Sequence, residues 1–212
     1  MWTADDLDKF ERRHPIGSKA RLALALLAFT GARRSDVVRL GPPMVRDGCL
    51  TWVPRKGRNR EEPMEHSLPI IADLKAVMDA TPVVGTVTWL VTHYGKPFSP
   101  EGFGNKMKDW CREAGIADKN SHGVRKAAAK RMAERGASTH ALMACFYWLD
   151  IKQAELYTRE CGSIRPHLGA HGDRWAEKQS KIRILKLGWC PRRDLGRCPA
   201  KHSNSGGYCL FL

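Results

Sequence analysis

The chain has 212 residues, a formal net charge of +14 at pH 7 and a sequence pI near 9.8. This length fits one domain with a tail, and the charge favours a polyanionic partner, above all nucleic acid, with an anionic membrane surface as the alternative. The longest apolar run, residues 22–29, is far shorter than the roughly 20 residues that span a bilayer. The first ten residues lack the basic start of a secretory signal, so we expect a cytoplasmic protein that does not bind membranes.

In chain order, the first expected elements are helices. Thr3 precedes two acids and is typical of a helix N-cap, which predicts a helix over residues 4–13. Ser18 predicts the start of a second helix, which passes through the apolar run LALALLAF to about Gly31 and forms part of the core. A short third helix is expected to begin at Ser35, in SDVVRL.

From Met44 the pattern becomes typical of strands. The segments CLTWV and PMEHSLPI predict a small antiparallel sheet, whose connection, PRKGRNREE, is strongly basic. A helix is expected over ADLKAVMDA, and a further short strand over WLVT. Lys56 lies on the basic connection beside a glycine, where it is either a solvated hairpin tip or a mobile group that can reach a ligand.

The second half again predicts helices. Ser99 followed by proline starts one that continues through EGFGNKMKDWCREAG, and three more are expected over SHGVRKAAAKRMAERG, STHALMACF and IKQAELYTR. The predicted fold class is therefore α+β, mostly helical with a small antiparallel sheet. We place one domain at 1–160 and a basic, irregular tail at 161–212, with a short helix possible around DRWAEKQSKI.

The seven cysteines are irregularly spaced, and without an export signal we expect free thiols. A zinc site could be drawn in the tail, but the tail has no CxxC pair, so we expect no metal there. Its four residues would be Cys190, Cys198, His202 and Cys209.

Two motifs carry side chains suited to binding phosphate. His122 and Arg125 are three residues apart and share a helix face, which is expected to point away from a packing stripe of Val124, Ala128 and Met132. Arg33, in TGARRSD, follows the most apolar helix and either projects into a cleft or stays on the surface near a helix C-terminus. Taken singly, each motif is more often part of a solvated basic surface than of a phosphate-binding site.

In their order along the chain, TGARRSD, RKG, HGVR and LYTR resemble the catalytic domain of tyrosine recombinases, the phage-type integrases. The resemblance covers about residues 3–160, including connectors such as THYGKPFSPEGFGNKMKDWCREAGI. The resemblance implies the mostly helical α+β fold of that catalytic domain. It also implies a reaction without cofactor or metal, and six catalytic positions. These are Arg33, Lys56, His122, Arg125, Trp148 (where a histidine is usual) and the nucleophile Tyr157.

These residue types suit the implied chemistry. A tyrosine can exchange one phosphoester for another by forming a 3′-phosphotyrosine, and two arginines can bind the transition state's non-bridging oxygens bidentately. Lys56 would protonate the leaving 5′-oxygen, and His122 would exchange a proton with the tyrosine or hold the phosphate. The indole N–H of Trp148 can donate a hydrogen bond but cannot transfer a proton, and this residue could equally be a packing tryptophan.

The resemblance implies a site-specific recombinase or integrase of a phage or mobile element, acting on double-stranded DNA as a homotetramer on paired sites. Two alternatives stay open: a type IB topoisomerase-like enzyme, and a non-catalytic DNA-binding remnant of an integrase. Strand exchange between two duplexes, rather than relaxation of one circle, would separate recombinase from topoisomerase.

Three features depart from the family pattern. Tyr147 stands where relatives usually have glycine, which predicts a strained or reshaped turn. The N-terminal, core-binding domain of the family is expected to be absent, and the segment after Tyr157 differs from the family's short C-terminal helix. A fragment or a decayed element is therefore part of the expectation, with weaker DNA binding through phosphate contacts.

Overall fold

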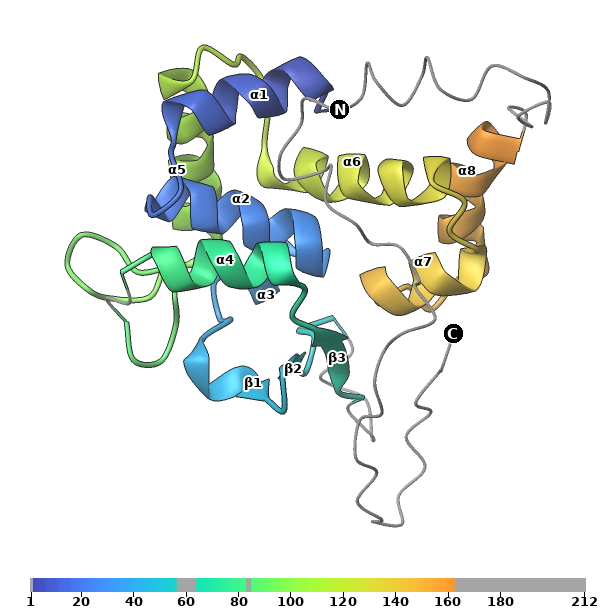
Figure 1. Ribbon diagram of the computed structural model, residues 1–212, viewed down its shortest axis with the longest axis horizontal. Helices are drawn as coiled ribbons and strands as arrows, with labels where there is room; N and C mark the ends of the chain where they lie inside the picture. Colours follow the sequence, from blue (N-terminus) through green and yellow to red (C-terminus); the bar gives the residue numbers. More distant parts are fainter. Residues whose placement is uncertain (1, 57–63, 83–84, 163–212) are drawn as a thin grey trace.

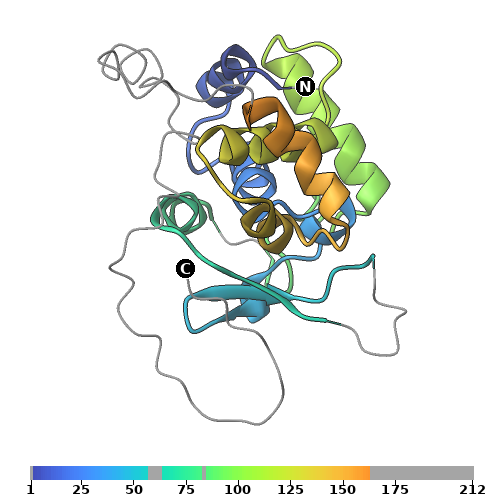
Figure 2. The same ribbon diagram turned by 90° about the vertical axis from the view of Figure 1, so that its right-hand side faces the viewer.

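The computed structural model describes residues 2–56, 64–82 and 85–162. The helices lie above a small sheet in both Figure 1 and Figure 2. In chain order the elements are α1 (Ala4–Arg13), α2 (Lys19–Thr30), α3 (Arg34–Val37), η1 (Pro42–Met44), β1 (Val45–Arg46), β2 (Cys49–Trp52), β3 (His66–Pro69), α4 (Ala72–Ala80), α5 (Pro100–Glu113), α6 (Ser121–Glu134), α7 (Thr139–Phe146) and α8 (Ile151–Gly162).

The predicted helix starts are confirmed by their caps. The Thr3 side chain accepts from the Asp6 N–H, while the Asp6 carboxylate accepts from the Thr3 N–H at 2.7 Å, so both donors are satisfied. The Ser18 and Ser99 side chains cap α2 and α5 by accepting from the backbone N–H groups of Arg21 and Gly102, without a reciprocal bond. The third helix is shorter than expected, because only residues 34–37 are helical.

α2 is the centre of the core, as its apolar sequence predicted. Every residue from Leu22 to Leu27 is at most 2% exposed, and the helix packs against both α4 and α6. It ends at Gly31, whose φ of 57° is a left-handed conformation. A Cβ on Gly31 would lie 2.6 Å from the ring of Phe146, so the glycine lets α2 approach the end of α7 closely.

The predicted antiparallel sheet is confirmed, with the order β1-β2-β3 and the register Leu50↔Leu68 and Trp52↔His66. β1 was not expected; Asp47 and Gly48, both at positive φ, form the two-residue turn that pairs it with β2. The strand expected at WLVT is wrong, because that segment makes only an isolated bridge, Val91↔Pro97.

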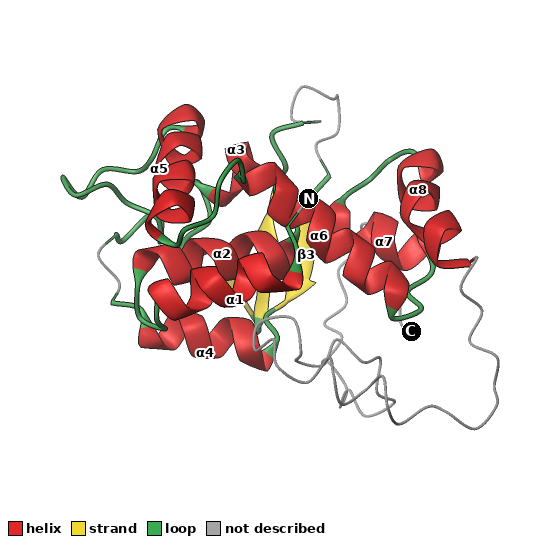
Figure 3. Ribbon diagram, turned by 90° about the horizontal axis from the view of Figure 1, so that it is seen from above, coloured by secondary structure: helices red, strands yellow, loops and turns green. Residues whose placement is uncertain are grey.

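The helices α6, α7 and α8 form a second apolar cluster beside the main core. It is built from small alanines and a few large rings, and α6 connects the two clusters because it packs on α2 as well as on α7 and α8. Figure 3 shows α6 running from the centre of the molecule towards α7 and α8. The buried members of this cluster are Ala128, Ala129, Ala133, Leu142, Phe146, Trp148 and Ala154.

The predicted irregular tail, with its short helix and its cysteine and histidine group, lies outside the described residues apart from its first two positions, which end α8. No helix in the part of the chain that the structure describes is long and apolar enough to cross a membrane.

Candidate active site

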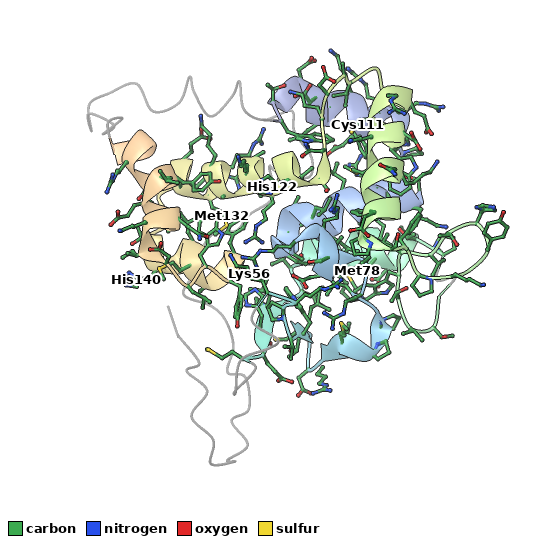
Figure 4. All side chains as sticks on the ribbon, turned by 180° about the vertical axis from the view of Figure 1, so that it is seen from behind. Lys56, Met78, Cys111, His122, Met132 and His140 are labelled. Carbon is green, nitrogen blue, oxygen red and sulfur yellow. The ribbon has the colours of Figure 1, made fainter. Side chains whose placement is uncertain are left out.

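Five of the six residues expected to be catalytic line one cleft of about 950 Å³. The cleft lies between the α2–α3 junction, the residues after β2, and helices α5, α6 and α8. Figure 4 shows Lys56 between the sheet and α6, with His122 above it on α6. The five residues are Arg33, Lys56, His122, Arg125 and Trp148.

The cleft is strongly cationic. Besides the three predicted cations, Arg34, Arg55 and Lys108 line it, and Glu101 supplies the one carboxylate among the described lining residues. Arg34 lies 3.9 Å from that carboxylate and crosses α5 at Gly104, where a Cβ would be 2.8 Å from its guanidinium. Such a concentration of positive charge favours binding of a phosphate-rich ligand.

The α2–α3 junction sets the position of Arg33. This residue is half-buried and is the N-cap of α3, and its carbonyl accepts from the N–H groups of Asp36 and Val37. Its backbone is therefore held by the first turn of α3, two residues after the left-handed Gly31. Of the two readings that the sequence left open for Arg33, the cleft is the one observed.

Asp36 connects this junction to the loop that carries Lys56. Its carboxylate is 2% exposed, accepts from the backbone N–H of Arg55 at 2.8 Å, and lies 3.8 Å from Arg39. Lys56 itself is exposed, and residues 57–63 after it are not described. A buried carboxylate thus fixes the chain one residue before the candidate acid.

Arg125 lines the cleft together with His122, as expected, but it is buried, so the expectation that this helix face points away from packing is wrong for Arg125. It is 6% exposed and lies over the rings of Phe146 and Trp148, 5.2 and 5.8 Å from their centroids. Its Nη2 donates to the carbonyl of Phe146. Burial, and then the charge of Arg33, lowers the pKa of Arg125 to about 9, so it stays charged at neutral pH.

His122 is exposed at the start of α6, whose N-cap is Asn120. Partial desolvation lowers its pKa, and the charges of Lys126, Arg125 and Arg33 lower it further. The lowered pKa favours the neutral imidazole near pH 7, which can accept a proton.

Trp148 and Tyr157 form a ring stack at the edge of the cleft. The Trp148 ring is stacked on Phe146, with ring centroids 5.1 Å apart, and on Tyr157, with ring centroids 5.3 Å apart and an interplanar angle of 12°. Trp148 is 9% exposed and also lines the cleft, so the packing and positioning roles are both compatible with its place. Tyr157 is half-buried and is not among the residues that line the cleft.

The turn between α7 and α8 is strained, as expected from Tyr147. Its φ of 48° and ψ of 52° are left-handed, a region that few residues other than glycine adopt. Its ring lies 5.4 Å from that of His66 on β3. His66 was not predicted from the sequence, since a single histidine in a short strand gives no functional signal.

His66 is 7% exposed, with Trp52 edge-on against it at 4.6 Å and its Nε2 3.2 Å from the carbonyl oxygen of Cys145. Burial lowers its pKa to about 4, and the charges of Arg125 and Arg33 act in the same direction. The ring is therefore neutral at pH 7. Within residues 2–56, 64–82 and 85–162, no three His, Cys, Asp or Glu side chains group in a way that could hold a metal ion.

The chain is similar to known proteins over this region. It is 30% identical over 157 residues to tyrosine recombinase XerC 2 of Ralstonia nicotianae, a match that covers 68% of this chain and 43% of the relative. The chain thus spans less than half the length of that relative.

Solved structures share its fold. A crystal structure of XerA recombinase superposes with a TM-score of 0.61 at 15% identity, covering 80% of this chain and 64% of that one. A lambda integrase tetramer bound to a Holliday junction gives 0.60 at 17% identity, covering 80% and 50%, and lambda integrase (residues 75–356) bound to DNA gives 0.58 at 19%, covering 80% and 63%. The model of the phage integrase family matches residues 4–161, and the chain belongs to that family.

Proposed function

We propose that this chain catalyses site-specific DNA recombination by cutting and rejoining DNA through a 3′-phosphotyrosine intermediate at Tyr157. The observation that carries the proposal is the cleft in which two arginines, a lysine and a histidine converge from three separate segments. Membership of the integrase family and the relative XerC 2 support this chemistry over other uses of a basic cleft.

Double-stranded DNA is the proposed substrate. The charge of +14 and the cationic lining of the cleft suit a phosphate backbone, whose contacts supply most sequence-independent affinity. Lambda integrase has been crystallised bound to DNA and as a tetramer on a Holliday junction. By analogy we propose that this chain acts as a homotetramer on paired sites.

In the proposed reaction, the Tyr157 oxygen attacks a backbone phosphorus and the bond from phosphorus to the 5′-oxygen breaks. The tyrosine proton passes to neutral His122, and Lys56 protonates the departing 5′-oxygen. Arg33 and Arg125 bind the non-bridging oxygens, where negative charge accumulates in the transition state. One phosphoester replaces another, so a 5′-hydroxyl can reverse the step and rejoin the strand.

For this reaction the Tyr157 hydroxyl has to reach a phosphate in the cleft. Because Tyr157 is stacked on Trp148 beside the cleft, we propose that DNA binding is accompanied by a shift of α8 along this ring stack. If that shift does not occur, Tyr157 stays outside the cleft lining. The chain would then fit the second candidate function, a non-catalytic DNA-binding remnant.

A nicked suicide duplex from the ends of the genetic element that encodes the chain tests the proposal. We expect a covalent protein–DNA adduct on a denaturing gel without added metal, and its loss in Tyr157→Phe. An adduct that survives this substitution, or that depends on Mg²⁺, would contradict the mechanism. DNA binding without any adduct would support the remnant.

A further inference from the structure

The C-terminal end of α7 is held from two other elements. The last carbonyls of a helix have no partner within it and need donors from elsewhere. Here the Cys145 carbonyl accepts from Nε2 of His66 on β3, at 3.2 Å, and the next carbonyl, of Phe146, accepts from Arg125 on α6. A carbonyl only accepts, so the neutral His66 carries its proton on Nε2.

A row of rings reinforces this attachment. Trp52 and His66 are cross-strand partners in the sheet, with ring centroids 4.6 Å apart, and His66 in turn lies 5.4 Å from Tyr147. Figure 2 shows the sheet directly beneath the helices that this row reaches. The row therefore runs from the strand that leads to Lys56 to the turn that leads to Trp148.

The row of rings ends at Tyr147, whose backbone conformation is strained. A φ of 48° is disfavoured for a residue with a Cβ, and such conformations persist only where the surroundings hold them. Backbone N–H groups of Tyr147 and Trp148 donate to the Met143 carbonyl within this turn. From outside it, the ring of His66 and the hydrogen bonds to the two carbonyls before Tyr147 hold the turn. Loss of His66 would leave a strained turn that carries Trp148 and, through Phe146, orients Arg125.

We propose that His66 is a positioning residue that fixes the α7–α8 turn, and with it Arg125 and Trp148, by donating to the Cys145 carbonyl and packing against Tyr147. The proposal rests on the proposed recombinase function for its kinetic consequence. Its structural consequence, an energetic coupling between His66 and Tyr147, holds in the absence of DNA.

The kinetic test compares three variants in single-turnover adduct formation and in equilibrium DNA binding. His66→Phe keeps a ring but removes the donor, and we expect adduct formation to slow at least tenfold while the Kd for DNA changes less than twofold. His66→Gln places an amide donor near the same carbonyl and should recover the rate to within about threefold. His140→Phe, on an exposed histidine of α7, is the matched control and should behave as wild type.

An adduct rate for His66→Phe within twofold of wild type would overturn the proposal. A parallel loss of DNA binding would overturn it too, because it would indicate damage to the whole cleft.

A thermal-unfolding cycle without DNA keeps the test independent of activity. Tyr147→Gly removes the strained side chain, so His66→Phe should lower the Tm clearly less in the Tyr147→Gly background than in wild type. Equal Tm shifts in the two backgrounds would contradict the coupling, whatever the activity. If wild type forms no adduct, the proposed function fails, and this cycle alone decides the role of His66.

Discussion

The two walls of the cleft are held in different ways. The cation wall, lined by Arg33, Arg55 and Lys56, is fixed by backbone hydrogen bonds and by the buried carboxylate of Asp36 behind it. The ring wall is Trp148, which lines the cleft, together with Phe146 and Tyr157, which stack on it outside the lining with ring centroids 5.1 and 5.3 Å away. Hydrogen bonds are directional, whereas stacked rings tolerate offsets. The cation wall, which is the proposed phosphate-binding side, is therefore pre-organised, while the packing of the ring wall, which includes the proposed nucleophile Tyr157, leaves room for a shift.

Arg125 joins the two walls, and its replacement should have the largest effect. In Arg125→Lys the positive charge remains, but the planar fork that can bind both Phe146 O and a phosphate oxygen is lost. We expect the adduct-formation rate to fall roughly 100- to 1000-fold, about 3–4 kcal/mol in the barrier. Single-turnover cleavage of the suicide duplex measures this rate. The control is Arg112→Lys, at an exposed arginine of α5. A loss below threefold would mean that Arg125 does not hold the phosphate.

The support of the ring wall should depend on pH through His66. The pKa of His66 is about 4 in the folded state, against 6.5 for an unperturbed histidine of the unfolded chain. Below pH 6.5 the unfolded chain takes up the proton more readily, so the stabilisation by neutral His66 is complete above pH 6.5 and is lost as the pH falls towards 4. The loss can reach about 3 kcal/mol in the free energy of unfolding. Urea unfolding of wild type and His66→Phe between pH 7 and 4 measures it. Parallel curves for the two proteins would show that His66 does not titrate in this way.

The end of α2, next to the cation wall, contacts Phe146 of the ring wall at Gly31. Alanine substitutions of two glycines test this contact. Gly31 and Gly48 both have positive φ, but a Cβ at Gly31 would meet the Phe146 ring at 2.6 Å while one at Gly48 meets nothing within 4 Å. Gly48→Ala should cost about 1 kcal/mol of unfolding free energy through strain alone. Gly31→Ala should cost roughly 2–3 kcal/mol, because overpacking adds to strain. Equal costs would mean that the two walls do not press together there.

Local signals in the sequence predicted most of the elements. The N-cap residue Thr3 gave the start of α1, and the expected helix ADLKAVMDA matches the bounds of α4. Asp47-Gly48, a common two-residue hairpin turn, was a usable signal for β1 that the prediction did not include. The expected strand at WLVT failed because strand-like residues form a ladder only when a partner strand lies alongside, and here only Val91 pairs, with Pro97.

The site was predictable in its residue types but not in its support. The ordered motifs named six residues, and the structure brings five of them to one cleft; their catalytic roles remain predictions. The burial of Arg125 depends on Phe146 and Trp148, which lie more than 20 residues further along the chain. The bonds from Asp36 to Arg55 and from His66 to Cys145 also join distant segments, so no local pattern could reveal them.

The proposed mechanism requires that Tyr157 becomes covalently linked to DNA. Mass spectrometry of the trypsin-digested suicide-substrate adduct tests it most directly, because cleavage after Lys152 and Arg159 isolates the peptide QAELYTR, which contains one tyrosine. We expect a nucleotide phosphate on Tyr157 in this peptide. A nucleotide on any other residue, or an unmodified QAELYTR peptide in a purified adduct, would contradict it.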